Sequence, residues 1–98
     1  MNLVCVCVRD VCANVFMSPF FAQSVGSAMR SFESEVNRVA EDNMLYKHPR
    51  DFELYQLGTF EPTSGKLELL PDKLQLCTAM SVMRAQPNDT RQLPLAAV

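Results

Sequence analysis

Apolar residues occupy both sides of two long segments of the chain, which is typical of strands buried on both faces. From Leu3 to Val8 the valines fall on one side, and Cys5 and Cys7 fall on the other. From Phe52 to Phe60 apolar residues again occur at both parities, and Gly58 interrupts them. The pattern predicts two well-buried strands, with both thiols on one face of the first and a bulge or close backbone approach at Gly58 in the second.

The segment after the second strand predicts a hairpin and a further strand. Glu61 to Lys66 has proline early and glycine late, which is the composition of a hairpin loop, and the strand that follows is expected at Lys66 to Leu70. Pro71 and Asp72 predict another turn. Alternation resumes from Lys73 to Thr78 and predicts a last strand.

The segment after the first strand predicts a short partner for that strand. Val11 to Met17 is apolar enough to form a strand that meets the first as a hairpin. Proline has no amide hydrogen to donate, so Pro19 is expected to end regular pairing before Phe20 and Phe21.

A helix is predicted from Ser24 to about Ala40. Ser24 is a suitable N-cap, and the apolar residues after it recur at the spacing of one helical face: Val25, Ala28, Met29, Phe32 and Val36. The opposite face is polar, so the helix is expected to lie on a sheet with Phe32 in the core. Glu41 to Arg50 lacks this period and contains Pro49, which predicts a loop.

These elements predict an α+β fold with one core. The expected sheet is small, mixed or antiparallel, and has three to five strands, with one main helix packed on one face. The 98 residues have the size of one domain. We expect that domain to span residues 1–83, and residues 84–98, which show no period, to form a flexible C-terminal tail.

Charge and hydropathy favour a protein of the cytoplasm without strong attraction to polyanions. The formal net charge is −2, so nucleic-acid binding would depend on a local site. The longest apolar run, Val11 to Phe21, is too short to span a membrane, and the first residues lack the basic start of a signal peptide. We therefore expect no membrane partner.

The cysteines are expected to be reduced core residues. Zinc ligated by Cys5, Cys7, Cys12 and His48 is the alternative, but structural zinc sites pair ligands two to four residues apart on a knuckle, not on one buried strand. His48 is the only histidine, and no glycine-rich phosphate loop or nucleophile motif occurs. We expect no enzyme activity, no cofactor, no metal and no small-molecule substrate.

One short segment mixes cations with aromatic residues, as single-stranded nucleic-acid sites do. The predicted contacts are Tyr46, Lys47, His48, Arg50 and Tyr55, with Arg30 on the polar side of the helix as a further cation. The alternative is an ordinary solvated loop, because Asp42, Asp51 and Glu53 flank the same segment.

The end of the chain favours self-association. A small sheet leaves edge strands, and between Lys73 and Arg84 no other charge protects such an edge. The predicted contacts of a symmetric dimer are Leu74, Leu76, Met80 and Val82. Packing in the protein's own core is the alternative for the last two.

The central segment resembles the small non-structural protein of gokushovirus-type microviruses. The similar residues run from Tyr46 to Phe60 and contain Lys-His-Pro, Asp-Phe and Leu-Gly, followed by a turn with glycine at Thr63 to Lys66. Upstream elements agree in order: Arg9-Asp10, Pro19-Phe20, and Ala28 to Phe32. Arg50 stands where that family usually has an acidic residue.

This resemblance implies a phage accessory protein without enzyme activity. Its expected role lies in viral genome replication or single-stranded DNA packaging in the cytoplasm of the bacterial host, with weak binding of single-stranded DNA. The alternative is a protein–protein interaction module, joining its own copies or a replication partner, that has no nucleic-acid contact.

Overall fold

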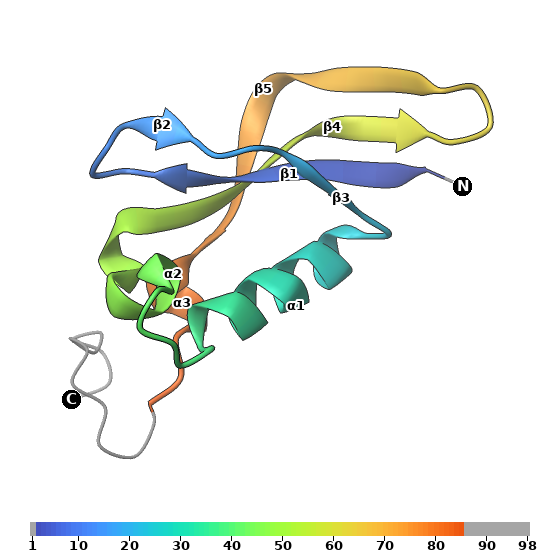
Figure 1. Cartoon of the computed structure of the whole chain (residues 1–98). Helices are drawn as coiled ribbons and strands as arrows, with labels where there is room; N and C mark the ends of the chain where they lie inside the picture. The colour runs from blue at the N-terminus through green and yellow to red at the C-terminus, as the bar shows by residue number, and fades with distance from the viewer. Residues whose placement is uncertain (1, 86–98) are drawn as a thin grey trace.

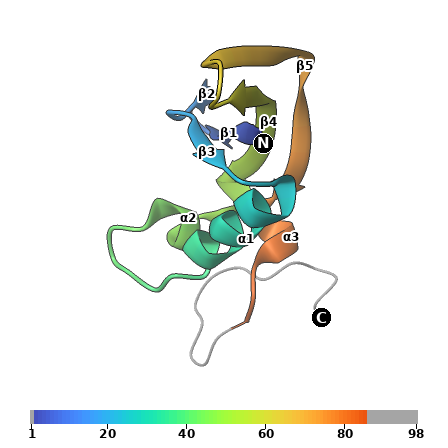
Figure 2. The same ribbon diagram turned by 90° about the vertical axis from the view of Figure 1, so that its right-hand side faces the viewer.

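A computed structural model describes residues 2–85 as a curled sheet with a layer of helices on one side. All strand pairings are antiparallel, and the strand order is β2-β1-β4-β5, with β3 also paired to β1. The α+β prediction is confirmed (Figures 1 and 2). The strands are β1 (Leu3–Asp10), β2 (Val15–Phe16), β3 (Phe20–Ala22), β4 (Phe52–Glu61) and β5 (Lys66–Thr78), and the helices are α1 (Val25–Val36), α2 (Met44–Lys47), the 3-10 helix η1 (Pro49–Asp51) and α3 (Ala79–Val82).

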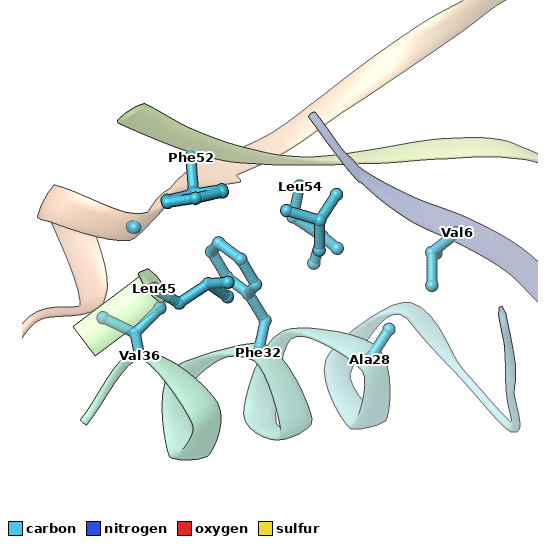
Figure 3. Close-up of a cluster of buried hydrophobic side chains, with 9 residues drawn as sticks. Val6, Ala28, Phe32, Val36, Leu45, Phe52 and Leu54 are labelled. Atoms are coloured by element: carbon cyan, nitrogen blue, oxygen red, sulfur yellow. The ribbon is translucent and has the colours of Figure 1, made fainter. Parts of the chain in front are cut away.

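The core lies between the centre of the sheet and α1. Val6 and Leu54 are fully buried on the sheet, and Phe32 of α1 points at the part of the sheet that carries Phe52 and Leu54 (Figure 3). The other labelled core residues in this view are Ala28, Val36, Leu45 and Phe52. The predicted core position of Phe32 is therefore confirmed.

Helix α1 begins where predicted and ends earlier. The Ser24 hydroxyl accepts a hydrogen bond from Ser27 N at 3.0 Å, which caps the first turn. The helix stops at Val36 rather than near Ala40, because the Asn37 side chain ends it by donating to Glu33 O at 2.8 Å. Val39, expected on the helix, is instead 64% exposed.

The prediction of a loop from Glu41 to Arg50 is wrong, because this segment contains two short helical elements. Asn43 caps α2 by accepting from Leu45 N at 3.1 Å, and its amide donates to Glu35 O in α1 and to Arg38 O just after it. Pro49 stands at the start of η1, where a missing amide hydrogen costs nothing. Segments this short lack the several turns that a periodicity test needs.

Strands β2 and β3 form one interrupted edge along β1. Of the predicted strand at Val11 to Met17, only Val15 and Phe16 belong to β2, because the first four residues form the turn. Just after β2, Met17 N donates to Val8 O at 2.8 Å. The prediction that pairing ends at Pro19 is wrong, because the chain re-enters the sheet at Phe20 to Ala22 opposite Val4 to Val6. Proline is tolerated between the two pieces because this strand is at the edge.

Strand β5 is continuous where two strands and a turn were predicted. It pairs with β4 up to Leu69, which is opposite Gly58, and pairing resumes at Leu74, which is opposite Gln56. Between these two pairs β5 therefore contains more residues than β4. The residues around Pro71 therefore bulge out of the ladder instead of making a separate turn. The predicted feature at Gly58 is confirmed, because a Cβ there would lie 2.1 Å from Glu68 O.

The predicted tail lies almost wholly outside the described residues. Arg84, which the prediction assigns to it, donates its backbone N–H to Asn37 Oδ1 at 2.7 Å. Asn37 also donates to Val82 O at 3.0 Å, so this side chain joins the end of α1 to the segment after α3.

Candidate functional site

The sheet face opposite α1 carries a set of residues that the register places side by side. Cys5, Cys7 and Arg9 alternate along β1 on this face, and directly paired residues share a face. Their β4 partners are Gly58, Tyr55 and Glu53. Cys5 and Cys7 are 3% and 1% exposed, which confirms that both thiols lie on one buried face, and we call this side of the sheet the thiol face.

Phe16 lies at one end of the thiol face, and two cations contact its ring. The guanidinium carbon of Arg9 is 5.8 Å from its ring centroid, and the ammonium nitrogen of Lys73 is 5.5 Å from it. The Tyr55 ring meets it edge to face with 5.5 Å between centroids. Phe16 is nevertheless 44% exposed, so part of its ring is open to solvent. We call Arg9, Phe16, Tyr55 and Lys73 the Phe16 cluster.

Polar contacts hold the Phe16 cluster in place. Arg9 donates to Asn14 Oδ1 at 2.9 Å in the β1–β2 turn, and its Nη1 lies 3.5 Å from Glu53 Oε1. The Tyr55 hydroxyl donates to the same carboxylate oxygen at 2.9 Å, and this hydrogen bond raises the pKa of Tyr55. Asn14 supports the turn by adopting a left-handed conformation, with φ of 58°.

The buried thiols form an uncharged floor beside this cluster. Burial raises the pKa of both Cys5 and Cys7 above the ordinary thiol value of 9.0. Lys73 opposes the rise at Cys7 more weakly. At neutral pH both side chains are therefore protonated and act as small apolar groups.

A second aromatic pair lies at the other end of the thiol face. Phe21 is paired with Cys5 and Phe60 with Leu3, and the two rings are 5.5 Å apart at a tilt of 54°. Phe21 is 48% exposed. The thiol face thus has a half-exposed ring near each end.

Three of the predicted nucleic-acid contacts are brought together at the end of the sheet. Lys47, His48 and Arg50 are exposed and line one hollow of about 160 Å³ with Pro49 and Asp51. Val11 N donates to Asp51 O at 2.7 Å, so this hollow is tied to the β1–β2 turn beside the Phe16 cluster.

The other predicted contacts are placed apart. Tyr55 belongs to the thiol face, whereas Arg30 is exposed on α1, on the opposite side of the sheet. Tyr46 is half-buried and lines a separate open hollow of about 480 Å³ with Val39 to Glu41 and Lys47.

Sequence reasoning missed Arg9, Phe16 and Lys73. They come from three different strands, and Lys73 of β5 meets Phe16 of β2 although these two strands are not neighbours in the sheet. The one local signal is a cation at the end of the first strand with an aromatic residue in its predicted hairpin partner.

The predicted self-association residues lie on two elements. Leu74 and Leu76 belong to β5, which ends the sheet, and Leu74 is 53% exposed. Leu76 packs partly against the core. Met80 and Val82 lie on α3 rather than on a continued strand.

Within residues 2–85, no group of three cysteine, histidine or acidic side chains is close enough to hold a metal ion. Cys12 is exposed in the β1–β2 turn, away from the buried Cys5 and Cys7. No helix in the same range is long and apolar enough to cross a membrane.

The structure defines a small α+β protein whose curled antiparallel sheet presents aromatic and cationic side chains on the face not covered by helices. The profile of the Phage ORF5 protein family matches residues 3–82, which is most of the chain. The chain therefore belongs to this family of phage proteins. No curated protein and no solved structure matches it.

Proposed function

We propose that this phage protein binds single-stranded DNA through the Phe16 cluster and the adjoining Lys47–Arg50 hollow. The observation that carries the proposal is the position of Phe16, a half-exposed ring flanked by Arg9 and Lys73. An unpaired base can stack on such a ring while the cations meet the neighbouring phosphates. A duplex keeps its bases stacked on one another and offers none to this ring.

The charge of the whole molecule fits a modest affinity. With a net charge of −2, long-range attraction to a polyanion is absent, so binding depends on a few local cations. Lys47, His48 and Arg50 lie at the same end of the sheet as Arg9 because of the Val11–Asp51 hydrogen bond. The hollow thus extends the set of phosphate contacts beyond the Phe16 cluster.

The role we propose is that of an accessory protein without enzyme activity in genome replication or single-stranded DNA packaging. It acts in the cytoplasm of the bacterial host. Membership of a phage family supports a viral role, and the resemblance of Tyr46 to Phe60 to the microvirus non-structural protein supports a phage with a single-stranded genome.

Titration with a fluorescent oligothymidylate at several salt concentrations tests the binding site. For single strands the logarithm of affinity falls with the logarithm of salt concentration, with a slope of roughly −0.7 for each phosphate contact. Lys73→Gln removes one such contact and is expected to make the slope less steep by about 0.7. A matching duplex is expected to bind more weakly than the single strand.

Lys66→Gln is the matched control, because Lys66 carries the same charge on the same strand. Its ammonium lies 3.4 Å from Glu68, and the register places it on the other side of β5 from Leu67 and Phe60. Its slope is expected to equal that of the parent. Equal slopes for all three proteins, or no binding at low salt, would refute the proposed site.

A second candidate function is self-association through β5. The last five residues of this edge strand, Leu74 to Thr78, carry neither charge nor proline, and such edges readily pair with another strand. This candidate requires no nucleic acid, and the oligomeric state of the protein in solution tests it.

A further inference from the structure

The backbone that lines the Lys47–Arg50 hollow is fixed before any ligand binds. Pro49 lines the hollow and is itself buried, and its ring locks its own φ. His48 N donates to Met44 O at 2.8 Å, and Asp51 N donates to His48 O at 3.0 Å. Asp51 O in turn accepts from Val11 N at 2.7 Å. The hollow therefore stands on a short, hydrogen-bonded segment rather than on a loose loop.

Three side chains that can carry positive charge line this hollow. Lys47, His48 and Arg50 are exposed, and neither Lys47 nor Arg50 takes part in an ion pair within residues 2–85. The ammonium is a compact charge, the guanidinium is a fork that matches two oxygens of one phosphate, and the imidazole has at least one N–H. Against them stands the carboxylate of Asp51, so the cations are in excess.

The size of the hollow selects a small ligand. Its volume of about 160 Å³ is about half of the roughly 300 Å³ at which sites for drug-sized ligands begin. A single phosphate group fits this space, and a whole nucleotide does not. A phosphate inside a DNA strand offers one negative charge and two free oxygens, whereas a phosphate monoester offers three free oxygens and a charge of about −1.5 to −2 at neutral pH. The monoester engages more of the donors that converge here.

We infer that the Lys47–Arg50 hollow is a site for a phosphate monoester, either at the end of a DNA strand or on a free nucleotide. The inference deepens the proposed function and rests on it for the use of this hollow, but it requires neither a strand nor contact with Phe16. Arg50 and Lys47 neutralise the phosphate, and His48 donates to a further oxygen. The sugar and the base stay outside the hollow.

His48 supplies a direct reporter of binding, because it is the only histidine of the chain. Thymidine monophosphate, added at constant pH and ionic strength, is expected to shift the ring-proton signals of His48 in NMR spectra. Dimethyl phosphate is a diester with one charge and two free oxygens, so it is expected to bind about tenfold more weakly. Thymidine, which has no phosphate, is expected to leave the signals in place.

Substitution of the guanidinium tests the assignment. Arg50→Gln removes the fork and one charge, so the affinity for thymidine monophosphate is expected to fall about tenfold. Arg50→Lys keeps the charge without the fork and is expected to fall between the parent and Arg50→Gln. Arg30→Gln is the matched control, because Arg30 is an exposed arginine on α1 that does not line the hollow. Its affinity is expected to equal that of the parent.

Two fluorescent oligothymidylates, one with a terminal phosphate and one without, distinguish the two sources of the monoester. Tighter binding of the phosphorylated strand assigns the hollow to strand ends, and equal binding together with a His48 shift by the monophosphate assigns it to free nucleotides. Equal affinities for the monophosphate and dimethyl phosphate, or for Arg50→Gln and Arg30→Gln, would overturn the inference even if DNA still binds at Phe16. Loss of all DNA binding with an intact His48 response would instead remove the proposed function and leave the phosphate site.

Discussion

Cys5 and Cys7 illustrate how burial changes the chemistry of a single residue type. Both thiols are buried on the inner part of the thiol face, whereas Cys12 is exposed in the β1–β2 turn. Desolvation disfavours the thiolate, so burial raises the pKa of Cys5 and Cys7. Because the thiolate is the reactive form, a disulfide reagent at neutral pH is expected to modify Cys12 first.

The same shift predicts a loss of stability at alkaline pH. Between the ordinary thiol pKa of 9.0 and the raised values, the folded chain binds more protons than the unfolded chain. The contribution of these two thiols to the free energy of unfolding is therefore fully present below pH 9. It is lost as the pH rises through the raised pKa values. Urea unfolding at pH 7 and at roughly pH 10 measures the fall.

The variant carrying Cys5→Ala and Cys7→Ala controls for other groups that lose protons in the same range. It is expected to be less stable at pH 7 because of the cavities, but to lose less stability between the two pH values. An equal loss in both proteins would show that these thiols do not carry the alkaline effect.

At the scale of elements, Gly58 decides how closely β4 and β5 approach. A Cβ at this position would lie 2.1 Å from Glu68 O and 3.0 Å from Leu69 Cα, both of them backbone atoms that cannot move aside alone. Gly58→Ala is expected to reduce the free energy of unfolding by about 3 kcal/mol, the upper part of the usual cost of overpacking. Chemical denaturation compares the variant with the parent.

Gly26→Ala is the matched control for the same substitution in an open position. Its nearest atom would be Ser24 Oγ at 3.9 Å, and alanine is the better helix former within α1. Stability is expected to rise by roughly 0.5–1 kcal/mol. A Gly58→Ala variant as stable as the parent would show that β5 can shift without cost.

The elements also show what local patterns predict and what they do not. Alternation predicts β1 and β4 correctly, and the spacing after Ser24 predicts α1, because each pattern extends over several repeats. Segments of two to four residues, such as β2, β3 and α2, have too few positions to show a period. The Phe16 cluster depends on the register of neighbouring strands and on the curl that brings β5 to β2, which no local pattern encodes.

For the whole molecule, the two halves of the β5 edge differ in their protection against pairing. The first part carries Lys66 and Glu68, and the bulge around Pro71 follows it. Charge, proline and bulges all discourage contact between edges. The unprotected part is Leu74 to Thr78, so self-association is expected there.

This part of the edge predicts a symmetric dimer that a single substitution separates. Light scattering at micromolar concentration is expected to report twice the chain mass of 11.0 kDa. Leu74→Lys places a charge on the exposed edge and is expected to restore the monomer, and Leu74 is preferable to Leu76 because the latter packs against the core. Leu69→Lys, at a position 70% exposed on the protected part of the same strand, is expected to leave the dimer intact. A parent protein that stays monomeric at this concentration would remove the dimer, and DNA binding would then depend on the cations of one chain alone.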